Sequence, residues 1–512
     1  MTSPNQAVLF TDVLVYDADA PDAVTGPTDV LVTGQRIAAI GDALGRIAPE
    51  GARVVEGRGH HLLAPGLINA HFHSPANHLK GMLPSLPLEV FMLYESPADE
   101  ALRPSPREAY LRTMLAALEM LRGGTTSVQD DAFVMPTPEP DIIDAIMSAY
   151  ADAGIRATVA LDQPELPEAD KLPFLAEIAG PELAAAIHGP APLSRADLLD
   201  RYAHLFEKWH GAAGGRLRGA VSVSAPQRVS VEYFKELAEL GEQHDVPMFV
   251  HMLETKVQRV LATEQPRFDG RSLVRYTADL GLLRERTNVI HAVWVDGDDL
   301  DLIAEAGATV AHNPVSNLRL GSGIMPFREI RRRGIPIGLG VDEAICNDAV
   351  DMWSVVRGAG LVHNVSGLDS DLWPSAAEVL DCLWTGGARV MGQSDDLGAV
   401  TVGRLADLVL IDLHSPAFTP LNDIRGQLVY CESGGSVRLT MVDGRVVAED
   451  GRVRTVDEVA LLDEARELFA ARKGALRAAH AGAARFQPAY AEMVRRAAAR
   501  EVGMNRWAGG HA

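Results

Sequence analysis

The sequence is poor in cysteine and contains no long apolar run. Its 512 residues include three cysteines, Cys346, Cys382 and Cys431, which lie far apart and form no Cys-x-x-Cys pair. These features exclude a disulfide framework and a cysteine-ligated zinc knuckle, and they fit a reducing compartment. No stretch of about 18 apolar residues occurs, and the first seven residues form neither a basic nor an apolar segment. We therefore expect no membrane span, no signal peptide and a cytoplasmic location.

Positive charge is also scarce. The chain has 47 Lys and Arg residues against 69 Asp and Glu residues, a formal net charge of -22. So acidic a surface repels phosphate, which argues against nucleic acid or an anionic membrane as the main partner. No internal repeat is found, and the first predicted strand is not followed by the Gly-rich phosphate turn of an open doubly wound sheet. What remains is an ordinary globular composition, long enough for one large domain and a smaller one.

Strand-like apolar runs alternate with helical periods from residue 65 onward. Eight runs cover residues 66–73, 125–131, 156–162, 217–226, 247–254, 287–295, 309–314 and 336–342. Helical patterns lie between them, for example over 107–122, 141–153, 231–244, 298–306 and 325–333. Eight β/α units over roughly 300 residues predict an α/β fold of the (β/α)8, or TIM, barrel type.

Short β-rich pieces flank the barrel on both sides. Those before residue 64 are separated by Gly, Pro and Asp, and similar runs return at 406–412, 437–442 and 445–448. We expect residues 1–64 and 398–455 to form one small β-sandwich domain, into which the barrel of residues 65–397 is inserted. The Ala-, Arg- and Glu-rich stretch 456–512 predicts a helical C-terminal extension.

A histidine pair ends the first barrel strand. His71 and His73 are two residues apart, so on a strand their imidazoles project from the same face. Alone, the pair is equally typical of two ordinary histidines. However, the C-terminal ends of barrel strands meet at one mouth. The later strand ends add His251 and Glu254 on the fifth run, His291 on the sixth and Asp342 on the eighth.

These side chains together predict a metal site. Three imidazole nitrogens and one carboxylate, from His71, His73, His251 and Asp342, suit a single divalent ion, Zn2+ or Fe2+, with one position left for water. Such an ion lowers the pKa of water from 15.7 to about 7. The end of the fourth run, residues 220–226, lacks a lysine that could bridge a second ion, which argues for one metal.

The same positions predict the catalytic groups. We expect Glu254 to move a proton from water to a leaving nitrogen, His291 to polarise the substrate or orient the nucleophile, and Asp342 to contact the attacking water. Taken singly, His291 is more typical of a core histidine, and the two acids are typical of helix starts or turns. Their joint occurrence, in strand order and at strand ends, favours a metal-dependent hydrolase.

The motifs resemble the amidohydrolase superfamily and, within it, the aminohydrolase and triazine-hydrolase branch. They are residues 65–73 (PGLINAHFH), His251-x-x-Glu254, His291, residues 312–317 (HNPVSN) and residues 338–342 (GLGVD). The resemblance implies the same metal ligands and catalytic residues. It also implies a hydrolase of carbon–nitrogen bonds in cyclic amidines, which acts on a small nitrogen heterocycle, and a homo-oligomer such as a dimer.

Two stretches narrow the resemblance. Nucleoside deaminases of this branch have a Pro-His-Ala-Pro-like turn after the fourth strand, where this chain has Val-Ser-Ala-Pro over 223–226. Residues 341–353 begin Val-Asp-Glu-Ala, where Thr-Asp-Gly is more usual. Both features resemble hydroxyatrazine ethylaminohydrolases, which remove an alkylamine from a hydroxy-s-triazine. A guanine, pterin or other purine or pyrimidine deaminase is the alternative, and a non-catalytic binding protein of the same fold is disfavoured because every ligand and Glu254 are present.

Position also predicts the substrate contacts. Ser224 and Asn317 lie at strand mouths, where they can hydrogen-bond ring nitrogens. Lys80 and Glu89 lie in the loop after the first strand and can contact the far side of the substrate. An ordinary loop role is an equal alternative for Lys80 and Glu89.

Overall fold

Eight parallel strand positions close into a barrel in the computed structural model, which describes residues 6–97, 99–367 and 369–508. The strands are β6 (Leu67–Phe72), β7 (Thr125–Asp131), β8 (Arg156–Ala160), β9 (Leu217–Gly219) with its continuation β10 (Val221–Ser224), β11 (Met248–Met252), β12 (Thr287–His291), β13 (Thr309–His312) and β14 (Ile337–Leu339). Neighbours pair in parallel, and a bridge between Phe72 and Asp342 joins the last strand position to the first. The predicted (β/α)8 barrel is confirmed.

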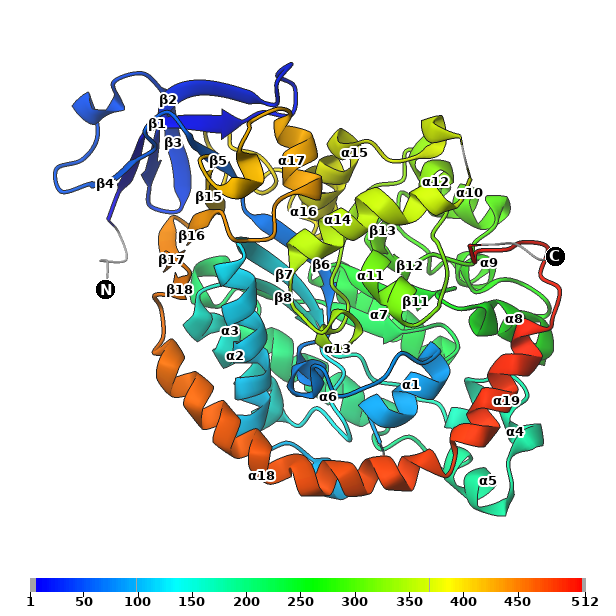
Figure 1. Ribbon diagram of the computed structural model, residues 1–512. Coiled ribbons are helices and arrows are strands. Elements are labelled where there is room, and N and C mark those ends of the chain that lie inside the picture. The colour runs from blue at the N-terminus through cyan, green and yellow to red at the C-terminus, as the bar shows by residue number, and fades with distance from the viewer. Residues whose placement is uncertain (1–5, 98, 368, 509–512) are drawn as a thin grey trace.

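Helices lie around the outside of the barrel and next to its mouth (Figure 1). They are α1 (Leu88–Glu95), α2 (Pro106–Arg122), α3 (Pro140–Ala153), α4 (Leu175–Ile178), α5 (Pro181–Ile187), α6 (Arg195–Trp209), α7 (Val231–Gln243), α8 (Lys256–Glu264), α9 (Leu273–Asp279), α10 (Gly297–Glu305), α11 (Pro314–Arg319), α12 (Phe327–Arg332), α13 (Ala344–Asn347), α14 (Met352–Val362), α15 (Ala376–Asp381) and α16 (Gly387–Val390). The five helical segments predicted from periodicity are found, with ends shifted by two residues at most. None of the helices among the described residues is both long and apolar enough to cross a membrane.

Local sequence explains where the helices begin. Helix α2 starts with Pro106, and the hydroxyl of Ser105 accepts from the amide of Glu108 while the Glu108 carboxylate accepts from the amide of Ser105. This reciprocal pair satisfies two amides that have no partner within the helix, and proline needs none. The strands of the barrel are buried on both faces, because side chains fill the interior and helices cover the outside.

Strands from both chain ends form one β module beside the barrel. They are β1 (Val8–Tyr16), β2 (Val24–Thr33), β3 (Arg36–Gly41), β4 (Arg53–Glu56), β5 (His61–Pro65), β15 (Leu408–Asp412), β16 (Val437–Val442), β17 (Arg445–Glu449) and β18 (Arg452–Val453). Strand β5 pairs antiparallel with β15, so blue and orange segments lie together in Figure 1. All nine strands form one sheet around a shared apolar core. The two chain ends therefore build one unit, as predicted.

The positions of the domain boundaries stay a prediction. Residues 1–5 of the first segment and 509–512 of the last lie outside the described residues. Helix α17 (Ile424–Tyr430) lies between β15 and β16 and contacts α14 and α15 on the barrel, so the two units share an interface.

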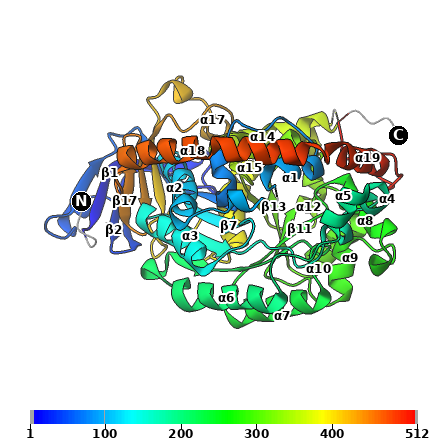
Figure 2. The same cartoon turned by 90° about the horizontal axis from the view of Figure 1, so that it is seen from below.

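The C-terminal extension is helical and runs along the barrel. Helix α18 (Glu458–Ala484) passes α2 and α1, and α19 (Gln487–Ala498) packs on α1, α4 and α8. Figure 2 shows both helices crossing the molecule from the β module to the far side of the barrel. Beyond α19, the indole of Trp507 packs edge-on against Trp294, with ring centroids 4.9 Å apart.

A buried ion cluster joins the floor of the barrel to the β module. Arg156, at the start of β8, donates to both carboxylate oxygens of Asp407, at 2.7 and 3.1 Å, and to Asp443 at 3.2 Å. The three residues are buried. Removing one member of such a cluster leaves the buried charges of the others incompletely compensated.

We expect Asp407→Asn to destabilise the protein by about 3 kcal/mol, because Arg156 stays buried with less compensating charge. Urea unfolding followed by circular dichroism measures the shift in the midpoint. The matched control is Asp396→Asn, which removes the exposed ion pair with Arg36 and should cost about 1 kcal/mol or less. Equal midpoints for the two variants would contradict a stabilising role for the buried cluster.

Candidate metal centre

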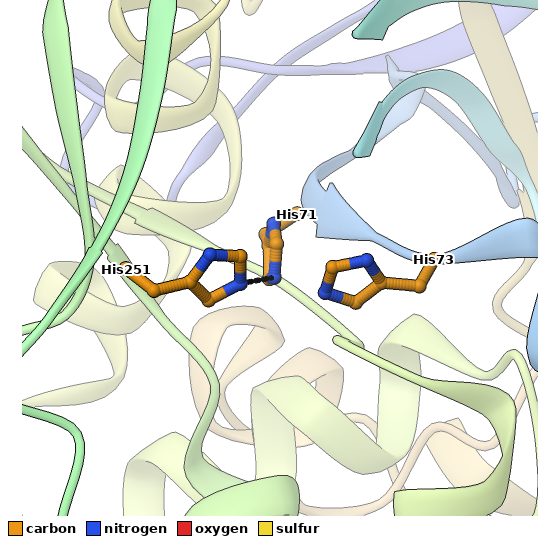
Figure 3. A group of neighbouring side chains, drawn as sticks. All are labelled: His71, His73 and His251. Atoms are coloured by element: carbon orange, nitrogen blue, oxygen red, sulfur yellow. Dashed lines mark hydrogen bonds between the residues drawn. The ribbon is translucent and has the colours of Figure 1, made fainter. Parts of the chain in front are cut away.

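Three histidine side chains converge at the mouth of the barrel. His71 lies on β6, His73 follows that strand, and His251 lies on β11. Their rings point toward one another in Figure 3, and the Nε2 atoms of His71 and His251 are 3.2 Å apart. One nitrogen from each ring lies within 4.8 Å of the others, and all three side chains are buried. The predicted pair on the first strand is therefore part of a larger cluster.

Asp342 adds a carboxylate to the cluster from the eighth strand position, which neighbours the first where the barrel closes. Its Oδ1 atom lies 3.2 Å from His71 Nε2 and 3.5 Å from His73 Nε2. The amide of Asp342 donates to the carbonyl of His71, and the amide of His73 donates to the carbonyl of Asp342, both at 3.0 Å. The backbone bonds that join the eighth strand position to the first thus also set the distance between these three side chains.

Backbone carbonyls orient two of the rings. The Nδ1–H of His73 donates to the carbonyl of Asp131, and the Nδ1–H of His251 donates to the carbonyl of Ser224 at 2.8 Å. Each bond fixes the tautomer and leaves the lone pair on Nε2, where a metal would bind. These hydrogen-bond partners cannot be predicted from the sequence, because every residue type has a backbone carbonyl.

Three strand ends at the site adopt left-handed backbone conformations. The φ angles are +61° at Ser224, +75° at His291 and +70° at Asp342. Such conformations are costly for residues other than glycine and cluster at functional sites, where the surrounding structure enforces them. Ser224 is one of these left-handed residues, and its carbonyl is the one that accepts the hydrogen bond from His251.

The charge states of these groups suit a divalent ion. Burial lowers the pKa of His71 to about 3 and that of His251 well below its usual range, so both imidazoles are neutral donors at pH 7. Burial alone would raise the pKa of Asp342, but the hydrogen bond from His71 and the neighbouring imidazoles hold it well below its usual range. Three imidazole nitrogens and one carboxylate, all buried, fit Zn2+ better than a hard cation such as Mg2+.

Glu254 and His291 lie next to this cluster. The Oε2 atom of Glu254 is 3.5 Å from His291 Nε2, and its Oε1 atom accepts from the hydroxyl of Ser322 at 3.3 Å. Burial raises the pKa of Glu254 well above its usual range, and the charges of Asp342 and Glu89 add to the effect. On the other side, His291 Nδ1 lies 3.0 Å from the amide oxygen of Asn317. A group that can hold a proton thus stands beside the predicted metal ligands.

The residues predicted to bind substrate lie in different surroundings. Ser224 is buried at the site, but its hydroxyl accepts from Arg228 at 3.1 Å. Asn317 contacts His291, as described above, and Glu89 is buried and accepts from the hydroxyl of Thr255. Lys80 instead forms an ion pair with Glu119 at 2.7 Å, and it is not among the residues that line the cavity at the cluster. Ser224 and Asn317 thus contact residues of the site but do not line its cavity. Glu89 lines the larger cavity beside it, and Lys80 lines neither.

Sequence reasoning missed several polar neighbours. A cavity of about 40 Å³ at the cluster is also lined by Arg228, Glu95, Glu343 and Asp162. In addition, the hydroxyl of Ser316 donates to Asp342 Oδ2 at 2.5 Å. Glu343 and Arg228 follow strand ends closely and could have been inferred from that position. Glu95 lies at the end of α1, and no spacing rule connects it to the barrel mouth.

The whole chain was compared with known protein families, curated proteins and solved structures. The model of the Amidohydrolase family matches residues 62–447. A 5-methylthioadenosine/S-adenosylhomocysteine deaminase of Nitratidesulfovibrio vulgaris is 31% identical over 91% of this chain and 98% of its own length. A zinc-bound adenosine deaminase from Xanthomonas campestris has a TM-score of 0.78 at 27% identity, covering 93% of this chain and 99% of that one.

A second solved structure, of lower sequence identity, has the same fold. The zinc complex of atrazine chlorohydrolase from Arthrobacter aurescens has a TM-score of 0.79 at 24% identity, covering 90% of this chain and 100% of that one. The sequence motifs predicted this superfamily, and the match to the family model spans the barrel and all the predicted metal ligands. The chain belongs to the amidohydrolase family.

Proposed function

We propose that this protein hydrolyses a carbon–nitrogen bond on a nitrogen heterocycle and releases ammonia or an alkylamine. One divalent ion, Zn2+, would be held by His71, His73, His251 and Asp342, and it would supply the Lewis acidity that activates water at neutral pH. The observation that carries the proposal is the position of Glu254 and His291 beside the three-histidine cluster in one buried cavity.

Glu254 is the proton carrier in this proposal. Its carboxylate takes a proton from the attacking water and delivers it to the leaving nitrogen, which departs as a neutral amine. Because burial raises the pKa of Glu254, the carboxyl group can hold the proton between the two transfers. The hydroxyl of Ser322 and the main-chain amide of Glu254, which donates to Gln258 at 2.9 Å, keep the residue in place.

His291, next to Glu254, orients the attacking water in this proposal. The amide oxygen of Asn317 accepts from its Nδ1–H, so the lone pair on Nε2 faces Glu254 and Asp342, at 3.5 and 3.9 Å. Burial lowers the pKa of His291, which keeps the imidazole neutral. A neutral ring in this position orients the attacking water and accepts a hydrogen bond from it.

Amino-purines are the first candidate substrate class. The proteins with similarity over nearly the whole chain include a deaminase of 5-methylthioadenosine and S-adenosylhomocysteine. The second candidate is removal of an alkylamine from a hydroxy-s-triazine. It is supported by Ser224, which stands where nucleoside deaminases of this branch have a histidine and whose hydroxyl is bound to Arg228.

Replacing Glu254 with glutamine should lower kcat by about 10²–10⁴, because the amide cannot carry the proton. The variant should keep its fold and its metal, which elemental analysis and circular dichroism measure. Glu305→Gln, on the exposed side of α10, is the matched control and should leave kcat unchanged. A kcat for Glu254→Gln within about tenfold of the wild type would contradict the assigned role.

The purified protein should contain one zinc ion per chain, and His73→Ala should lower this content strongly because it removes a buried donor. Elemental analysis measures the ratio directly, without any substrate. His188→Ala, an exposed histidine outside the cluster, is the control and should keep the full content. Equal zinc in both variants would remove His73 from the ligand set.

A substrate screen separates the two candidate classes. Purine nucleosides, guanine, pterins and hydroxytriazines are incubated with the enzyme, and released ammonia and alkylamine are quantified separately. We expect Ser224→Ala to change the ratio of kcat/KM between the best purine and the best triazine by about tenfold. This is the effect of losing about one hydrogen bond to one of the two substrates. Zinc content should not change, because His251 is held by the carbonyl of residue 224 and not by its side chain. An unchanged ratio would exclude Ser224 from substrate selection.

A further inference from the structure

A second, larger cavity lies beside the metal centre. It measures about 510 Å³, against about 40 Å³ for the cavity at the cluster. Four residues line both: Leu88, Met92, Arg228 and Gln258. The two cavities therefore adjoin along these side chains.

The inner cavity is too small to hold a whole substrate. Sites for small molecules typically measure about 300–1,000 Å³, a range that the outer cavity reaches and the inner one does not. A heterocycle whose reacting carbon lies next to Glu254 must therefore extend past Met92 and Arg228 into the outer cavity.

The C-terminal extension forms one wall of the outer cavity. Ala479 and Ala483 of α18, Phe486 between the helices and Tyr490 of α19 line it, opposite residues of α1 and α5. The family model ends at residue 447, so this wall lies outside the region that defines the family. Figure 2 shows α18 and α19 next to α1 and α5.

The wall is attached to two helices next to the site, α1 and α8. His480 Nε2 donates to the carbonyl of Tyr94 at 2.8 Å, and Lys256, at the start of α8, donates to the carbonyl of Ala498 at 2.7 Å. Tyr490 and Met493 belong to one apolar cluster with Val257 and Val260 of α8. Because α8 follows Glu254 directly, the extension packs on the element next to the proposed proton carrier.

The lining of the outer cavity is mainly apolar. Met92, Leu93, Phe133, Leu183, Ile187 and Phe486 are among its lining residues. Two ion pairs lie in the lining, between Lys171 and Glu168 at 3.0 Å and between Arg485 and Glu182. Two further charged side chains are held by neutral partners, since Arg228 donates to the hydroxyl of Ser224 and Glu89 accepts from that of Thr255. A charged group entering the cavity would lose its water and find few free partners, whereas an apolar group gains from burial.

We propose that this cavity binds the non-reacting substituent of the substrate, an uncharged alkyl, alkylthio or aryl group, and that α18 and α19 determine how large that group can be. The inference rests on the proposed function only for the position of the reacting ring. An apolar substituent is compatible with both candidate classes, because alkylthio nucleosides and N-alkyl triazines each carry one.

Binding of an uncharged fluorophore tests the cavity without any turnover. Prodan, a neutral naphthalene dye, is titrated into the zinc-loaded enzyme and then displaced by competitors. We expect 5-methylthioadenosine to displace it at least tenfold better than adenosine or S-adenosylhomocysteine, or hydroxyatrazine to displace it at least tenfold better than its dealkylated analogue ammeline.

Variants of the extension locate the site. Ala483→Phe fills the cavity and should weaken binding of the dye and of the substituted competitor by at least tenfold, whereas Phe486→Ala should admit larger substituents. Ala481→Phe is the matched control, because Ala481 is exposed on the same helix and does not line the cavity; it should bind like the wild type. If thermal unfolding shows that Ala483→Phe is misfolded, Ala479→Leu makes the same test with a smaller side chain.

The outcomes separate this inference from the proposed function. Unchanged binding of the dye in a folded Ala483→Phe or Ala479→Leu variant overturns the inference, and so does displacement that ignores the substituent in both competitor series. Selective displacement without release of ammonia or alkylamine from any competitor supports the cavity site and contradicts the proposed function. Turnover with no preference for substituted substrates supports the function and overturns the inference.

Discussion

The arrangement of this molecule depends on one constraint, the burial of several side chains that can bind a metal at the point where the barrel closes. Imidazoles and a carboxylate can be buried together only if hydrogen bonds or a metal ion satisfy them. The amides of His73 and Asp342 join the first strand position to the eighth, and these same bonds bring their side chains together. Gly340 permits the approach, since a Cβ atom there would lie 2.9 Å from the backbone nitrogen and the Cβ atom of His71. The backbone hydrogen bonds that close the barrel therefore also bring the site residues together.

Around this centre the backbone has as large a role as the side chains. The carbonyls of Asp131 and Ser224 select the tautomers of His73 and His251, and the left-handed conformations at Ser224, His291 and Asp342 aim the strand ends. The scaffold holds these strained residues in place because the barrel strands are buried on both faces. The C-terminal extension adds a second layer, since it packs on the helix after Glu254 and covers the cavity next to the cluster.

The sequence by itself determined the fold class and predicted the residues that the fold gathers at the candidate site. Alternating apolar runs and helical periods are local patterns, so eight strands and the helices between them could be predicted from them. The C-terminal ends of the strands in a parallel barrel meet at one mouth, so residues at these ends are expected to lie close together. This reasoning led to His71, His73, His251, Glu254, His291 and Asp342. The pairing of both chain ends in one β module followed from the return of β-type runs after the barrel.

Only the tertiary structure decided how the neighbouring residues contribute. Ser224 contacts His251 through its carbonyl and Arg228 through its hydroxyl, and Lys80 is engaged by Glu119. Neither arrangement could be predicted, because residue type does not encode carbonyl direction and loop side chains choose partners from distant segments. Glu95 and the wall formed by α18 and α19 reach the site from sequence positions far from the strand ends. Such contacts follow from how elements pack in space, and a local sequence pattern carries no information about that packing.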